Sequence, residues 1–232
     1  MGGYPCIVKP HLSHEGEKAD IRKCVSFNEL ENYLKGLTRK GYKDVLVQEF
    51  VDYDYQYVIH GALLQNLSLN PFILLKNIRE WPNTGGTGCF RCYENNSIIK
   101  DYVIELLNKL RESGYRGLFD IELFSSRGNL LLNEINFRSS GVGYSMLKTK
   151  VYYPFFFYLD AKGERVEGHS MCYTGQGYVM NELSDISNVK HGTLSLLKWI
   201  RDVGKTKSFA YFFIKDLKPT AIIYWNWMKS RF

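Results

Sequence analysis

Two short stretches place polar side chains that could bind a cation at every second position. The stretch LFDIELF carries Asp120 and Glu122 between apolar residues, and LLNEINFRSSG, which follows a turn, carries Glu134 and Asn136. Successive side chains of a strand point to opposite faces, so the members of each pair share one face. A strand without such a role would alternate residues such as Val and Thr, and the pattern therefore indicates chemistry.

The register of these two strands follows from matching their polar faces. The match pairs Glu122 with Glu134 and Asp120 with Asn136. It leaves a three-residue loop, 127-RGN-129, in which Gly and Asn can adopt positive φ. A two-residue loop would put the carboxylates on opposite faces, so we expect the longer one.

Carboxylates on directly opposite residues repel each other, and a cation is expected between them. Glu122 and Glu134, with the amide of Asn136 as a third oxygen donor, suit Mg²⁺, with Mn²⁺ as an alternative metal; phosphate oxygens and water would complete the octahedron. Arg138 extends the row with a guanidinium that can bind phosphate. The alternative interpretation is a solvated hairpin face with ordinary surface acids.

The composition bounds the class of protein. Of 232 residues, 45% are hydrophobic and 23% charged, which argues against disorder. No apolar run reaches the ~20 residues that span a bilayer, and the net charge of +6 comes without a dense basic tract. Five sparse cysteines fit a reducing compartment. We therefore expect a cytoplasmic protein with no nucleic-acid and no membrane partner.

The elements that would position the polar residues can be read from periodicity and capping. Ser26 precedes a helical pattern with Glu29 at the capping-box position, and Gly114 follows a second one. Helices are predicted over residues 27–37, 97–112 and 193–203. Strands are predicted at 4–8, 44–51, 57–64, 73–76, 118–124 and 130–137 and in 209-FAYFFI-214, and loops at 11–24 and 79–88.

Five ordered motifs together resemble the ATP-grasp superfamily over about residues 4 to 160. They are PCIVKP, VQEFV, KNIREWPNTGGTG, DIEL and NEINFRSSG. Members of this superfamily join a carboxylic acid to an amine or a similar nucleophile at the expense of ATP. The resemblance implies an α+β fold with two lobes whose antiparallel sheets clasp the nucleotide. The expected divisions are 1–50 for the first lobe, 51–160 for the second lobe with the metal site, and 161–232 for a C-terminal α/β extension.

The resemblance also assigns roles in the first lobe and at the hinge. Lys9 resembles the lysine that contacts the nucleotide phosphates, and Asp54 falls where an acid takes the ribose hydroxyls. The hinge that hydrogen-bonds adenine corresponds to the backbone of Gln48, Glu49, Phe50 and Val51.

Further roles fall in the second lobe. The metal ligands of the superfamily correspond to Glu122, Glu134 and Asn136. Arg138 resembles the basic residue that steadies the transferred phosphoryl group, and with Lys9 it is the expected catalytic cation. The resemblance implies two more cations, Lys76 and Arg79, which would face the phosphates or the substrate carboxylate.

Two features set the chain apart within this resemblance. Members usually carry an N-terminal domain of roughly 100 residues or more that has no counterpart here, so either the chain is a fragment or another chain supplies the missing part. A homodimer is a separate expectation. Residues 161–232 are similar to the tail of the carbamoyl-phosphate-synthase-like and D-aspartate-ligase-like branch, which acts on cell-wall peptides or polysaccharides. Trp225 and Trp227 are expected to complete a core or a subunit contact.

The expected function is therefore an ATP- and Mg²⁺-dependent carboxylate-amine ligase that works through an acylphosphate. Its partners would be ATP, a small carboxylate and an amine. Two alternatives stay open: a small-molecule kinase with the same nucleotide site, and a non-catalytic nucleotide-binding module.

Overall fold

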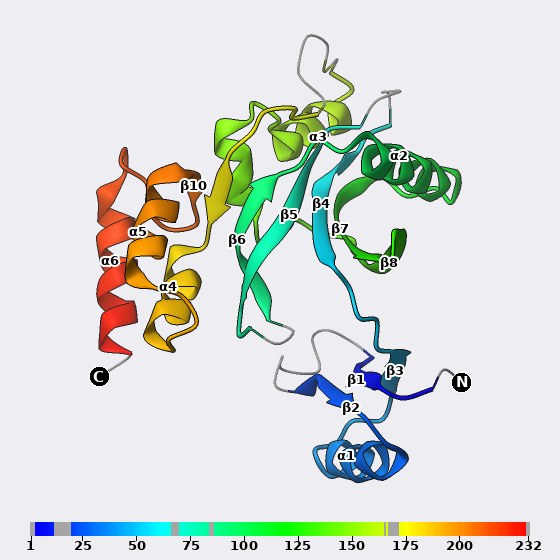
Figure 1. Cartoon of the computed structure of the whole chain (residues 1–232). Coiled ribbons are helices and arrows are strands. Elements are labelled where there is room, and N and C mark those ends of the chain that lie inside the picture. The colour runs from blue at the N-terminus through cyan, green and yellow to red at the C-terminus, as the bar shows by residue number, and fades with distance from the viewer. Residues whose placement is uncertain are drawn as a thin grey trace. The chain divides into compact units, whose positions relative to one another are not determined.

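The computed structural model describes residues 3–11, 20–65, 70–83, 86–164, 166 and 172–230 (Figure 1). The chain divides into two units, Met1–Asp52 and Tyr53–Phe232. Both contain helices and antiparallel strands, which confirms the α+β class. The division into three parts at residues 50 and 160 remains a prediction.

The first unit is a three-stranded antiparallel sheet covered on one face by a helix. Its strand order is β2–β1–β3. Cys6 and Val8 are buried with Leu37 of the helix, and because side chains alternate along β1, Lys9 lies on the opposite face of the sheet. The elements are β1 (Cys6–Pro10), β2 (Arg22–Cys24), α1 (Phe27–Arg39) and β3 (Val45–Glu49). The strand β2 lies within the predicted loop 11–24, of which residues 12–19 are outside the described part.

Two predicted helices begin where expected; the second also ends there, and the first ends two residues later than predicted. The first, α1, begins after Ser26, whose Oγ accepts the backbone N–H of Glu29 at 3.3 Å. The second, α2 (Ser97–Glu112), ends before Gly114, whose φ of +87° is favourable only for a residue without a side chain. Local capping chemistry was therefore sufficient to predict both helices.

The second unit is built on a seven-stranded sheet (Figure 1). Its order is β10–β9–β6–β5–β4–β7–β8, and every neighbouring pair is antiparallel except β9 with β10. The strands are β4 (Tyr55–Leu63), β5 (Phe72–Trp81), β6 (Thr87–Tyr93), β7 (Gly117–Ser126), β8 (Asn129–Asn136), β9 (Tyr178–Met180) and β10 (Thr206–Phe209).

Each face of this sheet has its own apolar core. Ile99 and Val103 of α2 pack against one face, which includes Ile121. The other face packs against the 3-10 helix η2 (Gly143–Lys148) and α3 (Tyr153–Ala161), and its core includes Val58. Because Val58 is the cross-strand partner of Glu122, the carboxylates lie on this second face.

The strands β7 and β8 pair in the predicted register. Glu122 lies opposite Glu134, and Asp120 lies opposite Asn136. The predicted three-residue loop is wrong, however. The turn has two residues, 127-RG-128, with φ of +49° and +80°, because Ser126 and the residue after the turn are already paired. Such a turn with two positive φ values matches the right-handed twist of a hairpin.

A β-bulge reconciles the short turn with the predicted pairing. Glu122 pairs with Glu134, whereas the next residue, Leu123, pairs with Leu132. Asn133 is therefore an extra residue on β8. One extra residue exchanges the two faces of a strand, so the bulge returns Glu134 to the face of Glu122.

Other predicted boundaries need correction. Residues 79–88 are not one loop, because β5 continues to Trp81 and β6 starts at Thr87; residues 84–85 lie outside the described part. The strand predicted in FAYFFI ends at Phe209, where β10 stops. The carboxylate of Glu182 instead accepts backbone N–H groups of residues 210–212.

Three helices lie together at the β10 end of the sheet (Figure 1). They are α4 (Glu182–Lys190), α5 (Leu196–Lys205) and α6 (Leu217–Lys229), and α5 corresponds to the predicted helix 193–203. In the described part of the chain, no helix combines the length and the apolar composition needed to cross a bilayer.

Arg79 of β5 fastens α4 and α5 to the sheet. Its guanidinium donates to Asp185 at 2.7 and 3.0 Å and to Asp202 at 2.6 Å, and it lies 4.2 Å from the ring centroid of Phe90. The side chain of Arg79 is 14% exposed and that of Asp185 is fully buried. The sequence suggested Arg79 as a phosphate-facing cation, but two carboxylates already hold its guanidinium, so we correct its role to a structural one.

Arg79→Met should therefore destabilise the fold. The substitution leaves two buried carboxylates without their cation, and we expect a loss of about 3 kcal/mol in the free energy of unfolding. Urea denaturation measures it. Lys109→Met is the matched control, because Lys109 pairs with Glu105 on the exposed surface of α2 and should matter little. Equal stability of the two variants would contradict the assigned role.

Candidate active site

A row of acidic and amide side chains crosses three strands on one face of the sheet. Glu122 and Asp120 of β7 lie opposite Glu134 and Asn136 of β8, and His60 of β4 lies opposite Asp120 on the other side. The row is possible because β7 alternates these residues with Phe119, Ile121 and Leu123, which are completely buried on the α2 face. The apolar half of the strand thus fixes the orientation of the acidic half.

A chain of hydrogen bonds holds Glu122 in place. Gln56 Nε2 donates to Glu122 Oε2 at 2.9 Å, and the same oxygen accepts from Nδ2 of the bulge residue Asn133 at 3.3 Å. Gln56 Oε1 accepts from Asn77 Nδ2 at 2.7 Å, and Asn77 Oδ1 accepts from Arg91 Nε at 2.7 Å. Four strands are thereby connected by side chains to one carboxylate oxygen, which restricts its rotamers.

The acids are held in a state that disfavours their negative charge. Burial raises the pKa of Glu122 above its ordinary 4.5, and repulsion from Glu134 and Asp120 raises that pKa further. Burial likewise raises the pKa of Asp120, although nearby Ser140, Arg138 and Arg91 oppose the effect. The oxygen Oδ1 of Asp120 is buried and accepts no hydrogen bond from the described residues. A cation bound here would relieve both conditions.

The oxygen donors of this row fit a hard divalent cation that takes its remaining ligands from phosphate and water. Among the described residues, no three His, Cys, Asp or Glu side chains are grouped closely enough to hold a metal by themselves. Two carboxylates and an amide, from Glu122, Glu134 and Asn136, leave coordination positions for phosphate oxygens and water. This division of ligands is the one that Mg²⁺ uses with nucleotides.

A buried histidine fastens the segment that follows β8. His60 Nδ1 lies 3.1 Å from Tyr153 Oη, and Nε2 lies 2.9 Å from Ser145 Oγ. Complete burial and the charge of Arg91 lower the pKa of His60 to about 3, so the ring is neutral at physiological pH. It therefore acts as a hydrogen-bonding spacer between β4 and the helices η2 and α3.

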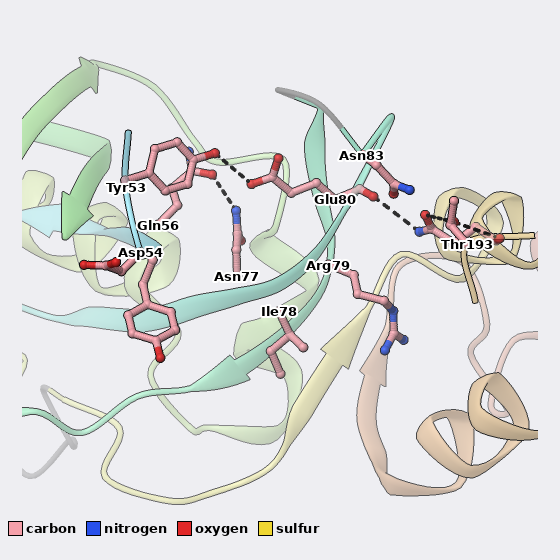
Figure 2. A pocket seen from close by; sticks show the side chains of 11 residues that line it. Tyr53, Asp54, Gln56, Asn77, Ile78, Arg79, Glu80, Asn83 and Thr193 are labelled. Atoms are coloured by element: carbon pink, nitrogen blue, oxygen red, sulfur yellow. Dashed lines mark hydrogen bonds between the residues drawn. The ribbon is translucent and has the colours of Figure 1, made fainter. Parts of the chain in front are cut away.

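A cavity of about 380 Å³ lies in the second unit, and Figure 2 shows side chains that line it. Gln56 and Asn77 line it, and these two residues belong to the hydrogen-bond chain that reaches Glu122. Tyr53 Oη donates to Glu80 Oε1 at 3.4 Å across it, and burial together with Glu80 raises the pKa of Tyr53 to about 12. Figure 2 shows the Arg79 side chain directed away from Gln56. The cavity is polar, and Gln56, which lines it, also donates to Glu122.

The first-unit residues that were expected to bind the nucleotide lie in two places. One is a face of the sheet, and the other is the edge strand β3 with the residues that follow it. Lys9 is on the face opposite α1. Lys23 of β2 shares this face as the partner of Ile7, and its Nζ lies 3.4 Å from the ring centroid of Phe50. Gln48 and Glu49 are in β3, which is an edge strand, so one side of its backbone has no strand partner in this sheet. Phe50 N donates to Pro5 O at 3.1 Å, and Val51 is the second-last residue of the first unit.

The remaining suggested residues differ in their surroundings. Asp54 lines the cavity, and its carboxylate accepts the backbone N–H of Arg127 in the β7–β8 turn at 3.3 Å. Arg138 is exposed just beyond β8, close enough to lower the pKa of Asp120. Lys76 is on the α2 face, with its Nζ 3.3 Å from the ring centroid of Tyr55, because its strand partner is Tyr57. The structure thus does not bring Lys76 to the face of the carboxylates.

The sequence did not identify three polar residues of this face. Arg91 is only 3% exposed, and it lowers the pKa of both Asp120 and Glu122. Gln56 and Asn77 connect it to Glu122. One signal was available: the strand GCFRCY places an arginine where a buried strand of the sheet would carry an apolar residue. The partners of Arg91 are far away in sequence and could be found only in the fold.

Comparison with solved structures decides the fold. Carboxyaminoimidazole ribonucleotide synthase from Aspergillus clavatus, solved with ATP, matches 78% of this chain and 46% of that chain at a TM-score of 0.59 and 14% identity. L-amino acid ligase from Bacillus licheniformis matches 70% of this chain and 39% of that chain at a TM-score of 0.51 and 16% identity. The chain has the ATP-grasp fold. The resemblance seen in the five sequence motifs is confirmed at this level.

Sequence comparison adds a distant relative that is also much longer than this chain. No family model matches the chain. Formate-dependent phosphoribosylglycinamide formyltransferase from Wolinella succinogenes is 24% identical over 164 residues, which cover 68% of this chain and 41% of the relative. The ATP-grasp chain described here therefore spans less than half the length of these relatives.

The raised acid pKa values predict how the metal-free protein responds to pH. A carboxyl whose pKa is raised on folding contributes stability below its ordinary pKa, and that stability is lost as the pH rises through the folded value. The wild type should therefore lose unfolding free energy as the pH rises above 4.5. Glu134→Gln removes one cause of the raised pKa of Glu122, so its loss should be smaller.

Urea denaturation between pH 4.5 and 8 without divalent metal measures this difference. Glu112→Gln, an exposed acid at the end of α2, is the control and should follow the wild-type curve. If Glu134→Gln shows the same pH dependence as the wild type, the two carboxylates do not repel each other as the structure implies.

Proposed function

We propose that this chain is an ATP- and Mg²⁺-dependent ligase that joins a carboxylate to an amine through an acylphosphate. The observation that carries the proposal is the pairing of Glu122 with Glu134 on a face that also carries the buried cation Arg91. The comparisons support it, since one relative with this fold is named an L-amino acid ligase and another was solved with ATP.

Magnesium would be held by Glu122, Glu134 and Asn136. When bound, it would supply neutralisation of the negative charge on the β- and γ-phosphates of ATP. Gln56 and Asn133 fix the orientation of Glu122 before the nucleotide arrives, which reduces the reorganisation that binding requires.

The protein's own cations would stabilise the phosphoryl transfer. In the first step an oxygen of the substrate carboxylate attacks the γ-phosphorus and ADP leaves. Arg138 and Arg91 are the second-unit cations near the acids, and Lys9 is the proposed cation from the first unit. In the second step the amine attacks the acyl carbon, phosphate leaves, and the amine loses a proton. No protein nucleophile is required, so positioning and charge are the catalytic contributions.

Hydroxylamine trapping tests the reaction. With ATP, Mg²⁺ and a panel of amino acids and small carboxylic acids, we expect an acyl hydroxamate that forms together with ADP. Glu134→Gln should lower its rate by at least about 100-fold, because a metal ligand is lost. Glu112→Gln should retain wild-type activity. A phosphorylated hydroxyl product without hydroxamate would instead establish the kinase alternative.

The alternative of a non-catalytic nucleotide-binding module predicts ATP binding without any chemical turnover. Calorimetric titration with ATP separates it from the ligase. Magnesium-dependent binding that Glu134→Gln abolishes, but without any turnover across the substrate panel, would support a nucleotide-binding module. Metal-independent binding would contradict both.

The role in cell-wall or polysaccharide synthesis is a finer part of the proposal. It rests on the resemblance of residues 161–232 to one branch of the superfamily, and none of the relatives named above supports it. Lipid-linked or soluble cell-wall amines in the trapping assay, in place of hydroxylamine, would test it by amide formation.

A further inference from the structure

The net positive charge of this protein is confined to one region. Residues 191–232 carry eight Lys and Arg and two Asp, a net charge of +6, whereas residues 1–190 carry 22 basic and 22 acidic residues. One of the two acids, Asp202, forms an ion pair with Arg79. Of this excess, α5 and α6 carry +4, from five basic residues and Asp202.

The same region is richer in exposed large apolar side chains, for its length, than the rest of the described chain. Of the 28 exposed large hydrophobic residues in the described part, 11 lie within residues 196–228. On α5 the exposed fraction is 79% for Leu197 and 54% for Ile200, and on α6 it is 56% for Trp225 and 51% for Ile222. We call the exposed apolar residues of the two helices, with the basic residues beside them, the α5–α6 surface. Its members are Leu196, Leu197, Lys198, Ile200, Arg201, Lys205, Leu217, Lys218, Ile222, Trp225, Met228 and Lys229.

Basic residues lie beside the exposed apolar ones on both helices. At 100° per residue, Leu196, Leu197 and Ile200 follow one side of α5, and the basic residues of the helix follow the neighbouring side. On α6, Lys218 and Lys229 fall between Trp225 and Ile222 around the helix axis, and Lys229 Nζ lies 5.1 Å from the ring centroid of Trp225. An amphipathic helix that lies in a membrane interface has the arrangement of α5.

The two helices are fixed to the rest of the second unit by other side chains. Tyr224 Oη donates to the buried carboxylate of Glu182 at 3.0 Å, and Thr220 Oγ1 donates to Tyr211 O at 2.8 Å. Asp202 of α5 is bound by Arg79. The exposed apolar residues are thus held in place by the fold, and they are not the loose end of an unfolding segment.

We propose that the α5–α6 surface docks the protein on an anionic lipid bilayer. Its helices would lie in the headgroup region, with the apolar stripe inserted and the basic stripe against the lipid phosphates. A second copy of the chain fits less well, because a symmetric contact would oppose two surfaces of the same positive charge. Nucleic acid fits less well because it would leave the apolar stripe exposed to water.

Vesicle flotation of the full chain tests the proposal. We expect binding to vesicles of phosphatidylcholine with 30% phosphatidylglycerol, and little to phosphatidylcholine alone. Binding should weaken at high salt, because exposed charges are then screened. Lys218→Gln with Lys229→Gln should reduce the partition coefficient by about 25-fold, since each basic residue near an anionic surface contributes roughly fivefold.

The apolar stripe needs its own variant. Leu197→Gln with Trp225→Gln should lower the partition coefficient at least about tenfold without changing thermal stability, because both residues are exposed. The controls are Ile98→Gln, which is 71% exposed on α2, and Lys43→Gln in the first unit; both should bind vesicles like the wild type.

Three results would overturn the proposal. They are equal binding to neutral and anionic vesicles, binding that the α5–α6 variants leave unchanged, and absence of binding to either vesicle. If light scattering shows a dimer that Leu197→Gln with Trp225→Gln converts to a monomer, and vesicles are not bound, the surface is a contact between copies. Binding of an acidic protein but not of anionic vesicles would assign it to a protein partner.

Discussion

The repulsion between Glu122 and Glu134 is the constraint from which the site is built. Two acids on directly opposite residues of neighbouring strands are unfavourable by themselves, and burial adds to the cost by raising the pKa of Glu122. The fold nevertheless holds Glu122 with hydrogen bonds from Gln56 and Asn133. Such an arrangement is understandable if a bound cation removes the repulsion, and the unsatisfied Oδ1 of Asp120 points to the same conclusion.

The rest of the second unit serves to maintain this arrangement. The apolar half of β7 is completely buried against the α2 side, so β7 cannot rotate. The bulge at Asn133 brings Glu134 to the correct face, and the neutral His60 fastens η2 and α3 behind it. Arg91 provides the buried positive charge that partly offsets the acids. Each of these features is far from the others in sequence and meets them only in the sheet.

Local chemistry in the sequence predicted much of the fold. The capping residue Ser26 and the helix-terminating Gly114 located α1 and α2, and the alternating acids of DIEL and NEIN predicted the pairing of Glu122 with Glu134. The way in which this pairing is achieved could not be predicted, because a three-residue loop and a two-residue turn with a bulge give the same final register. Only the tertiary contacts of Leu132 and Asn133 distinguish them.

Site residues were harder to predict where their partners are distant. Arg79 is conspicuous in the sequence as a cation near a glycine-rich segment, yet Asp185 and Asp202, more than 100 residues later, hold it. Arg91 is the opposite case: its only local signal is its place in the buried strand GCFRCY, and its connection to the acids runs through Asn77 and Gln56 of two other strands. The periodicity of the sequence predicts helices and strands, but it does not predict ion pairs between residues that are far apart in the chain.

The central claim is that Glu122 and Glu134 share one divalent ion. Anomalous diffraction from crystals grown with Mn²⁺ and a non-hydrolysable ATP analogue tests it most directly. The account predicts a manganese peak within bonding distance of carboxylate oxygens from both residues and of a nucleotide phosphate. A peak that contacts only one of the two carboxylates, or nucleotide bound with no metal between them, would contradict it.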